Sequence, residues 1–323
     1  MTMRKDKKHD PVVGLLGKNG RLTQEIARSL ISLEPGRRVK TTSDYARLFR
    51  AGQGTVQKAF KTLEEMGAIA LESRGHLGTF LVKRDPSLLW AVGGLGTVSG
   101  MMPLPNSKEF EGIATAFSDL FGAYDIPLNL LHLNGSRRRV EHLRAGLTDF
   151  VLLSRFSADQ ECAEDPSLRI VMTCAPNSFY ARGSLAILTS AESGGLLESV
   201  GRVGIDATSR DHAEITHLEF DPDSVELVQT PYHLIPDLIL GGEIEAAAWH
   251  KTTRRIEAVS SDLRFAPLRS EAARRASEDL SRLTLLAPHD SEPVLSLLDL
   301  LLDSERIVEV ENEVIEGKRI PVF

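Results

Sequence analysis

The spacing of apolar residues changes once along the chain, near residue 85. Before that point apolar positions recur every three to four residues in three segments, which predicts helices over 22–33, 42–49 and 55–66. After it, short apolar runs alternate with amphipathic stretches, a pattern typical of a layered α/β domain. A chain of 323 residues suits two or three domains. We therefore expect one domain over 1–85 and a second over 86–323.

Two short apolar runs, at 69–71 and 79–81, follow the third predicted helix. The loop between them contains two glycines, which allow a sharp turn, and Arg74 and His76 would project from its tip. Two helices joined by a short glycine-containing turn and followed by a hairpin with a basic tip form a winged helix-turn-helix. In that motif the hairpin tip lies along the minor groove or the DNA backbone.

The third predicted helix has one apolar and one polar side. Its apolar positions face the core, which leaves Gln57, Lys58 and Lys61 on the outside. Glutamine can pair with adenine through two hydrogen bonds, and lysine can reach guanine or phosphate. Any solvated helix also presents a polar face, so the surrounding motif is what favours DNA. The residues expected to contact double-stranded DNA are Lys40, Thr41, Thr42, Ser43, Gln53, Gly54, Thr55, Gln57, Lys58, Lys61, Arg74, Gly75 and His76.

The charge is divided unevenly along the chain. Residues 1–85 hold 17 Lys/Arg and nine Asp/Glu, whereas the remaining residues hold 21 and 36, so a net charge of +8 precedes one of −15. A basic head on an acidic body confines phosphate attraction to the head. A small basic segment can also arise by chance, but the size of the difference favours a role in DNA binding.

The head resembles the winged helix of GntR-type transcription regulators. The resemblance covers about residues 20–82 and rests on a combination of short motifs: Gly36-Arg37-Arg38-Val39, Asp44-Tyr45-Ala46, Thr55-Val56-Gln57-Lys58-Ala59-Phe60, Leu63, Gly67 and Gly78-Thr79-Phe80. Those regulators usually carry arginines where this chain has Gln53 and Gln57, and a Glu-Arg pair where it has Thr42-Ser43. Contacts to A·T pairs through glutamine are therefore the alternative to arginine–guanine pairing. The Gly-Thr-Val-Gln-Lys-Ala form, joined to the body, resembles YhfZ-like regulators.

The second part of the chain reads as alternating strands and helices. Helices are predicted over 110–121 and 138–144. Strands are predicted over 88–92, 128–133, 148–154, 170–174, 185–188, 203–205, 225–229, 246–249 and 263–268. The stretches 143–151 and 240–249 share one form, a helix end, a glycine, a short turn, an acid and an apolar strand. This form resembles the bilobal fold of periplasmic solute receptors (type II), which implies a ligand bound between two lobes at strand ends.

The glycine-rich segment 93–100 is the first candidate for a ligand site, because its backbone N–H groups could approach an anion. The plain alternative is a loop between a strand and a helix. The second candidate is the segment Asn134-Gly135-Ser136-Arg137-Arg138-Arg139, since a serine at a helix start followed by arginine can hold a carboxylate or phosphate. A capped, solvated helix start is equally consistent. The residues expected to bind ligand are Gly94, Thr97, Ser99, Ser136, Arg137, Arg155, Ser178, Tyr180, Asp206, Ser209 and Trp249.

No pattern in the chain indicates an enzyme, a metal site or a cofactor. Cys162 and Cys174 are the only cysteines and have no CxxC spacing, and no catalytic motif or paired carboxylates are present. The charged start at 1–8 runs into no apolar core, so we expect a cytoplasmic protein with no membrane partner. The sequence therefore predicts a homodimeric transcription regulator that responds to a small, anionic metabolite. The alternative is a cytoplasmic enzyme on a solute-receptor-like fold, with the head as a tether or dimer contact.

Overall fold

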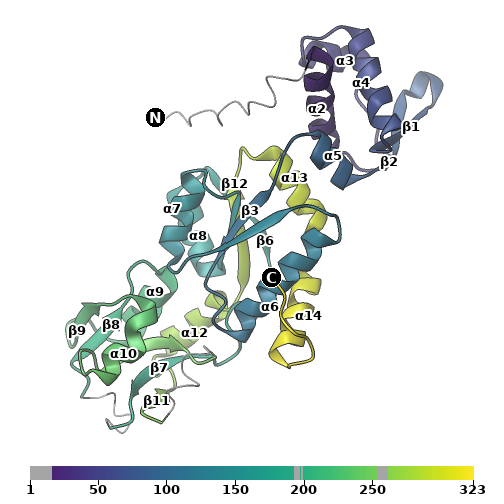
Figure 1. Cartoon of the computed structure of the whole chain (residues 1–323). Coiled ribbons are helices and arrows are strands. Elements are labelled where there is room, and N and C mark those ends of the chain that lie inside the picture. The colour runs from purple at the N-terminus through teal and green to yellow at the C-terminus, as the bar shows by residue number, and fades with distance from the viewer. Residues whose placement is uncertain (1–16, 193–196, 198, 253–260) are drawn as a thin grey trace. The chain divides into compact units, whose positions relative to one another are not determined.

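The computed structural model describes residues 17–192, 197, 199–252 and 261–323 (Figure 1). The charged start at 1–8, on which the expected cytoplasmic location rests, lies outside the described residues. The chain divides into two compact units. The first, which we call the head unit, contains residues up to Thr97 with the segments 123–127 and 292–300. The second, which we call the body, contains the rest.

Three helices and a hairpin form most of the head unit. The helices are α2 (Lys18–Leu30), α3 (Thr42–Leu48) and α4 (Gln53–Glu65), and the antiparallel strands are β1 (Ile69–Ser73) and β2 (Thr79–Arg84). Their core contains Ile26, Val56 and Leu63, all fully buried, with the ring of Phe60 edge-on to Tyr45 at 5.2 Å. Burial of these side chains is the main stabilising contribution to so small a unit.

Local hydrogen bonds fix the ends of these elements. Thr41 caps α3 through a capping box, in which its hydroxyl accepts from the N–H of Asp44 and the Asp44 carboxylate accepts from the N–H of Thr41. These bonds hold the pKa of Asp44 below its ordinary value. The hairpin turns through the 3₁₀ segment Gly75–Leu77 (η1), and Gly78 takes a positive φ of 97° that disfavours other residues.

The predicted strand over 88–92 is wrong, because these residues belong to helix α5 (Pro86–Val92). Asp85 caps this helix by accepting from the N–H of Leu88, and Pro86 occupies its first turn, where no N–H is needed. A short apolar run cannot by itself distinguish a strand from a buried helix. Helix α5 packs on α2 and stays in the head unit. Helix α13 (Glu292–Leu301) also lies largely in this unit.

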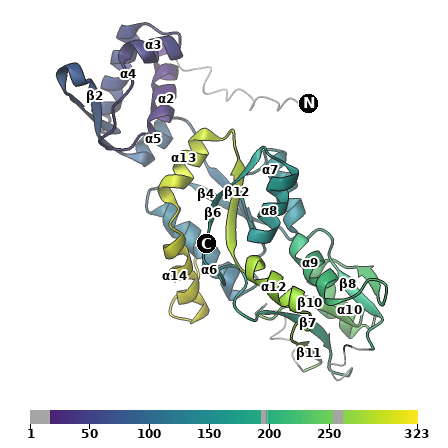
Figure 2. The same cartoon turned by 180° about the vertical axis from the view of Figure 1, so that it is seen from behind.

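The body contains two five-stranded mixed sheets. The first has the order β4-β3-β5-β12-β6, with β3 (Val98–Met102), β4 (Leu128–His132), β5 (Phe150–Ser154), β6 (Leu168–Thr173) and β12 (Leu283–Pro288). Strand β12 is antiparallel to both its neighbours, whereas β3 is parallel to β4 and β5. Helices α7 (Ser136–Arg144) and α8 (Arg155–Glu164) cover one face, and α6 (Lys108–Gly122) and α14 (Ser304–Ile315) cover the other (Figures 1 and 2).

The second sheet repeats this arrangement. Its order is β11-β7-β10-β8-β9, with β7 (Leu185–Ser190), β8 (Arg202–Ile205), β9 (Glu226–Gln229), β10 (Ala246–His250) and β11 (Leu263–Ala266). Its helices are α9 (Arg210–Glu219), η2 (Tyr232–Leu234) and α10 (Ile235–Leu240), and α12 (Glu271–Leu280) precedes the return to the first sheet. Strands β7 and β12, the first after each passage between sheets, are the antiparallel ones. The body is therefore bilobal, as the resemblance to solute receptors implies.

Two strands have no counterpart in the predicted pattern. Strand β12 occupies an apolar run for which no strand is predicted. Strand β3 occupies the end of the glycine-rich segment, and Gly100 on this strand lies under the ring of Phe150. A Cβ at Gly100 would meet that ring at 2.2 Å, so this glycine serves close packing. Both cysteines are free thiols, and no described helix is long and apolar enough to cross a membrane.

Candidate functional site

The outer face of α4 in the head unit carries the first candidate site. Gln57, Lys58 and Lys61 are exposed on it, as the amphipathic pattern predicts, while Val56 and Leu63 are buried beneath. Lys61 lies 3.5 Å from Glu65 on the same helix. An exposed pair of this kind contributes little to stability, so the ammonium group is available to other partners.

The start of α4 is joined to α3. Gln53 Nε2 donates to Ser43 Oγ at 3.1 Å, which fixes the two helices at the turn between them. Thr41, Ser43 and Gly54 are exposed, and Thr55 is half-buried beside them. The structure thus places the predicted residues of both helices at one end of the helix-turn-helix.

The tip of the hairpin differs from the expected projecting loop. Arg74 folds back on its own strand, where Nε and a terminal nitrogen donate to Glu72 at 2.8 and 2.6 Å and the guanidinium stacks over Phe80 at 4.6 Å. Its charge is therefore partly neutralised by a neighbour on β1. Gly75 and His76 remain exposed.

Two exposed arginines near this site escaped the sequence reasoning. Arg38 lies in a short segment that bridges β2 at Phe80, with its side chain close to Gly78. Arg47 lies exposed on α3. Their positive charge within the winged-helix segment could have indicated both arginines. Their exposure, however, is evident only from the folded structure.

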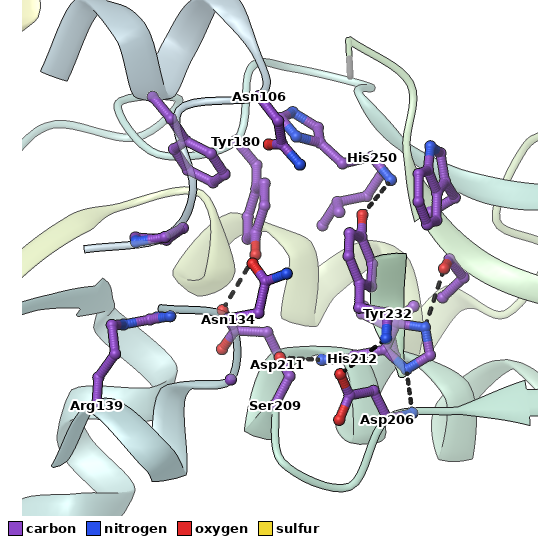
Figure 3. Close-up of a pocket in the computed structure, with 17 residues that line it drawn as sticks. Asn106, Asn134, Arg139, Tyr180, Asp206, Ser209, Asp211, His212, Tyr232 and His250 are labelled. Atoms are coloured by element: carbon purple, nitrogen blue, oxygen red, sulfur yellow. Dashed lines mark hydrogen bonds between the residues drawn. The ribbon is translucent and has the colours of Figure 1, made fainter. Parts of the chain in front are cut away.

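The second candidate site is a partly open pocket between the two lobes of the body (Figure 3). Its cavity volume is about 70 Å³, enough for a few water-sized groups. The loops after β3, β4 and β8 and the helices α6, α7 and α9 converge on it. Its lining consists of Pro103, Asn106, Phe110, Asn134, Gly135, Arg139, Tyr180, Leu185, Asp206, Ser209, Asp211, His212, Ile215, Tyr232, Ala248, Trp249 and His250.

Asp211, at the start of α9, joins the two lobes beside the pocket. Its Oδ1 accepts from the hydroxyls of Ser154 and Ser157 at 2.6 Å each, and Tyr180 OH lies 3.4 Å from Oδ2. Burial raises the pKa of Asp211 above its ordinary value, although these hydrogen bonds act against that rise. The serines come from the first lobe and the aspartate from the second.

Asp206 and His212 shape the second lobe's edge of the pocket. Both carboxylate oxygens of Asp206 are used locally, one by Thr208 and the other by the N–H of Tyr232 at 3.1 Å. His212 Nδ1 accepts from the N–H of Asp206 at 3.0 Å, so the proton is on Nε2, which donates to Ala248 O. Burial lowers the pKa of His212 to about 4, and the imidazole is therefore neutral.

Aromatic rings form much of the remaining wall. Tyr232 stacks on Trp249 with ring centroids 4.4 Å apart, and its hydroxyl accepts from the N–H of His250 at 3.0 Å. The His250 ring reaches back to the first lobe, with Nε2 3.4 Å from Glu109 Oε1 on α6. Burial alone would raise the pKa of Glu109, but the nearby His250 ring and the hydrogen bond from Thr252 outweigh it and lower that pKa to about 2.

Arg139 on α7 is the only arginine or lysine of the pocket lining. One terminal nitrogen donates to Leu133 O at 2.8 Å, and among the described residues Nε has no hydrogen-bond partner. Burial lowers the pKa of Arg139 to about 10, although Tyr180 and Asp211 act against the fall. The side chain remains a cation at neutral pH.

The structure brings four of the predicted ligand residues into this pocket: Tyr180, Asp206, Ser209 and Trp249. It does not bring the glycine-rich segment there, because Gly94 and Thr97 lie in the head unit, where Arg28 Nε donates to Gly93 O at 2.7 Å. Ser99 lies on β3, its N–H bonded to Asp149.

The other predicted residues lie beside the pocket or away from it. Ser136 is buried behind the lining and its hydroxyl accepts from the N–H of Arg210 at 2.9 Å. Arg137 is exposed, Arg155 pairs with Asp159 at 2.7 Å, and Ser178 bonds the backbone of Ala175 and Leu283. Helix geometry explains the difference at α7, since position 139 faces inward while 137 faces solvent.

Eight polar or aromatic residues of the lining are absent from the predicted ligand residues: Asn106, Phe110, Asn134, Arg139, Asp211, His212, Tyr232 and His250. A signal existed for Arg139 and Asp211, because they lie two residues after the predicted Arg137 and Ser209, respectively. Choosing among such neighbours requires the rotational phase of the helix, which the short segments did not define.

Comparison with known proteins agrees with this architecture. Residues 85–323 match the family model described as the YhfZ C-terminal domain. The chain belongs to the YhfZ family. Residues 34–81 of this YhfZ family member match a helix-turn-helix domain model. Among the described residues, no three His, Cys, Asp or Glu side chains are grouped to hold a metal ion.

Individual relatives cover nearly the whole chain. A YhfZ protein of Escherichia coli (strain K12), described as uncharacterized, is 29% identical over 306 residues, covering 95% of this chain and 98% of its own length. The crystal structure of YhfZ from Shigella flexneri aligns with a TM-score of 0.57 at 26% identity, over 73% of this chain and 97% of that one. The periplasmic aliphatic sulphonate binding protein SsuA from Escherichia coli aligns with a TM-score of 0.49 at 13% identity, over 69% and 75% of the two chains.

Proposed function

We propose that this chain is a DNA-binding transcription regulator whose affinity for DNA changes when a small metabolite occupies the pocket of the body. The observation that carries the proposal is the presence, in one chain, of a helix-turn-helix with an exposed Gln57/Lys58 face and a separate unit that encloses a polar pocket. A pocket with convergent polar groups and no poised nucleophile suits binding better than catalysis.

Contacts between the two lobes support a ligand-sensitive body. Arg210 Nε on α9 pairs with Glu161 on α8 at 2.6 Å, and Thr252 donates to Glu109 at 2.7 Å, so both pairs connect the lobes. A ligand that contacts both lobes would favour one arrangement of them over others. That differential affinity is the free energy available to alter DNA binding.

The proposed active form is a homodimer that places two winged helices on two half-sites. Half-sites one helical turn apart are separated by about 34 Å, so a small change in the spacing of two heads alters affinity. We retain the GntR-type likeness of the head as part of this proposal. DNA binding would place the protein in the cytoplasm.

Selection of DNA by the full-length chain tests the proposal. Random duplexes are enriched on the purified protein, and the affinity for the recovered sequence is measured at 50 and 200 mM salt. With roughly 6–10 phosphate contacts, affinity is expected to fall by about 10³–10⁵ over this range. A recurring sequence with such a salt response supports the regulator. Enrichment of no sequence, or a flat salt response, contradicts it.

A charge-matched pair of variants locates the contact. Lys58→Ala, on the outer face of α4, is expected to weaken binding to every duplex. It should also reduce the slope of log affinity against log salt concentration by about one. Lys318→Ala removes the same charge from the body and is expected to leave binding unchanged. Equal effects of the two variants would contradict the assignment of α4.

A further inference from the structure

We propose that the pocket of the body takes a small monocarboxylate with a flat, apolar body, whose carboxylate pairs with Arg139. This inference rests on the proposed function, because it names the chemical class of the metabolite. The anionic character expected from the sequence then depends on a residue that the sequence analysis did not single out.

The guanidinium of Arg139 is the first reason. The residue is only 4% exposed, yet its hydrogen bond within the described structure goes to a neutral carbonyl, Leu133 O. Removing a charge from water is costly unless a partner of opposite charge compensates for it. A buried arginine that lines a cavity and has an unused Nε–H is therefore prepared for an anion.

The acids that line the same pocket do not supply this partner. Asp206 is saturated by Thr208 and the N–H of Tyr232, and Asp211 by Ser154, Ser157 and Tyr180. Among the described ion pairs, none joins Arg139 to either carboxylate within 4.0 Å. Figure 3 shows the Asp211 carboxylate turned towards Tyr180, and Asp206 farther from Arg139 than Asp211 is. Asp211 therefore acts on Arg139 through its charge but forms no ion pair with it, and the Nε–H of Arg139 is left to a ligand.

The charges around the cavity favour a ligand that carries a single negative charge. A guanidinium presents parallel N–H groups that match the two oxygens of a carboxylate. A phosphate monoester carries up to two negative charges at neutral pH, and Asp206 and Asp211 in the same lining would repel it. The cavity volume of about 70 Å³ also limits the ligand to a small molecule.

The apolar body is inferred from the aromatic rings of the lining. Tyr232 and Trp249 are stacked with an interplanar angle of 8°, and Phe110 and Tyr180 form a second pair of rings. Flat apolar groups pack on such rings by stacking or edge contacts. A hydrophilic body would lose its water without regaining hydrogen bonds there.

Binding by the full-length protein tests the ligand class. Acetate, butyrate and benzoate are compared with acetamide, butyramide, benzamide and benzenesulfonate by calorimetry. At least one carboxylate is expected to bind, with its amide at least tenfold weaker. Arg139→Met is expected to weaken carboxylate binding at least tenfold. Arg138→Met, which removes an exposed arginine from the same turn of α7, is expected to change it less than twofold.

Three results of this comparison would overturn the inference: no carboxylate binds, an amide or the sulfonate binds as well as the carboxylate, or both arginine variants behave alike. DNA binding separates this inference from the proposed function. A carboxylate that depends on Arg139 but leaves DNA affinity unchanged supports the inference and contradicts the regulator. A neutral compound that alters DNA affinity does the reverse.

Thermal stability without ligand provides a test that needs no known compound. A buried charge without an ion-pair partner destabilises the folded protein, so Arg139→Met is expected to raise Tm by roughly 2–4 °C relative to Arg138→Met. A lower Tm, or failure of Arg139→Met to fold, would show that the guanidinium is a structural donor to Leu133 O and would overturn the inference.

Discussion

The outer face of α4 and the pocket of the body present polar side chains in opposite ways. On α4, Gln57 and Lys58 are exposed and surrounded by water. In the pocket, Asp206, Asp211 and His212 are buried, and each is hydrogen-bonded to other groups of the protein. Function on α4 is therefore separable from stability, whereas in the pocket the same side chains support both.

This difference has a practical meaning for substitutions. A change on the α4 face should alter DNA binding and leave unfolding untouched. A change in the pocket should alter unfolding first, and binding as a consequence. The following predictions test this separation.

The largest effect is expected at the ion pair between Arg210 and Glu161, which are 8% and 1% exposed. Arg210→Met leaves the buried carboxylate of Glu161 with less compensation, and about 3–5 kcal/mol of unfolding free energy should be lost. Denaturant unfolding measures it. Arg275→Met breaks an exposed pair with Glu271 on α12 and should cost less than about 1 kcal/mol. Similar losses of unfolding free energy in the two variants would contradict the claimed difference between buried and exposed ion pairs.

The next effect is a pH dependence that originates at His212. Its pKa is about 4 in the folded protein and near 6.5 when unfolded, so the unfolded chain binds more protons between these values. Stability from this group is complete above pH 6.5 and is lost as pH falls towards 4, by about 3 kcal/mol in total.

Comparison of His212→Gln with wild type isolates that contribution. The variant should lack this part of the loss between pH 7 and pH 4.5 in urea unfolding. His217→Gln, on the exposed side of the same helix, should retain it. A wild-type pH profile in His212→Gln would mean that the buried imidazole does not carry the effect.

A smaller effect, confined to DNA binding, is expected at Gln57. Gln57→Ala should reduce discrimination at one base pair by about 1–3 kcal/mol, with unfolding unchanged. The selected duplex and its single-base variants measure this. Gln160→Ala, an exposed glutamine of α8, is the control. Unaltered sequence preference in Gln57→Ala would exclude it from base reading.

The smallest effect is expected at Gly54, in the first turn of α4. No atom lies within 4 Å of an added Cβ, so Gly54→Ala should raise stability by about 0.5–1 kcal/mol while weakening DNA binding. Gly122→Ala, at the end of α6, should raise stability alone. Tighter DNA binding by Gly54→Ala would contradict a close approach of this backbone to DNA.

The helix-turn-helix could be predicted because its signals are local. The amphipathic spacing around Val56 and Leu63 and the glycines of the hairpin each define an element within a few residues. The α/β class of the body also followed from its pattern, and its two lobes from the resemblance to solute receptors. Helix α5 was not predicted. Asp85 and Pro86 are signals for a helix start, but the apolar run that follows them was interpreted as a strand.

The pocket could be predicted only in part. Tyr180, Asp206 and Trp249 follow or end strands, and strand ends in such folds collect at the cleft. Arg139 instead depends on the rotational phase of α7, and Gly94 on which unit its segment joins. Both are properties of tertiary packing, which no local pattern encodes.

The coupling between pocket and head is the central claim, and reciprocal titration measures it most directly. The affinity of the full-length chain for its selected duplex is determined with and without a carboxylate that binds the pocket. The affinity for that carboxylate is then determined with and without the duplex. The account predicts that both affinities change by the same factor, about 5–150-fold. Binding of each partner with no effect on the other would contradict it.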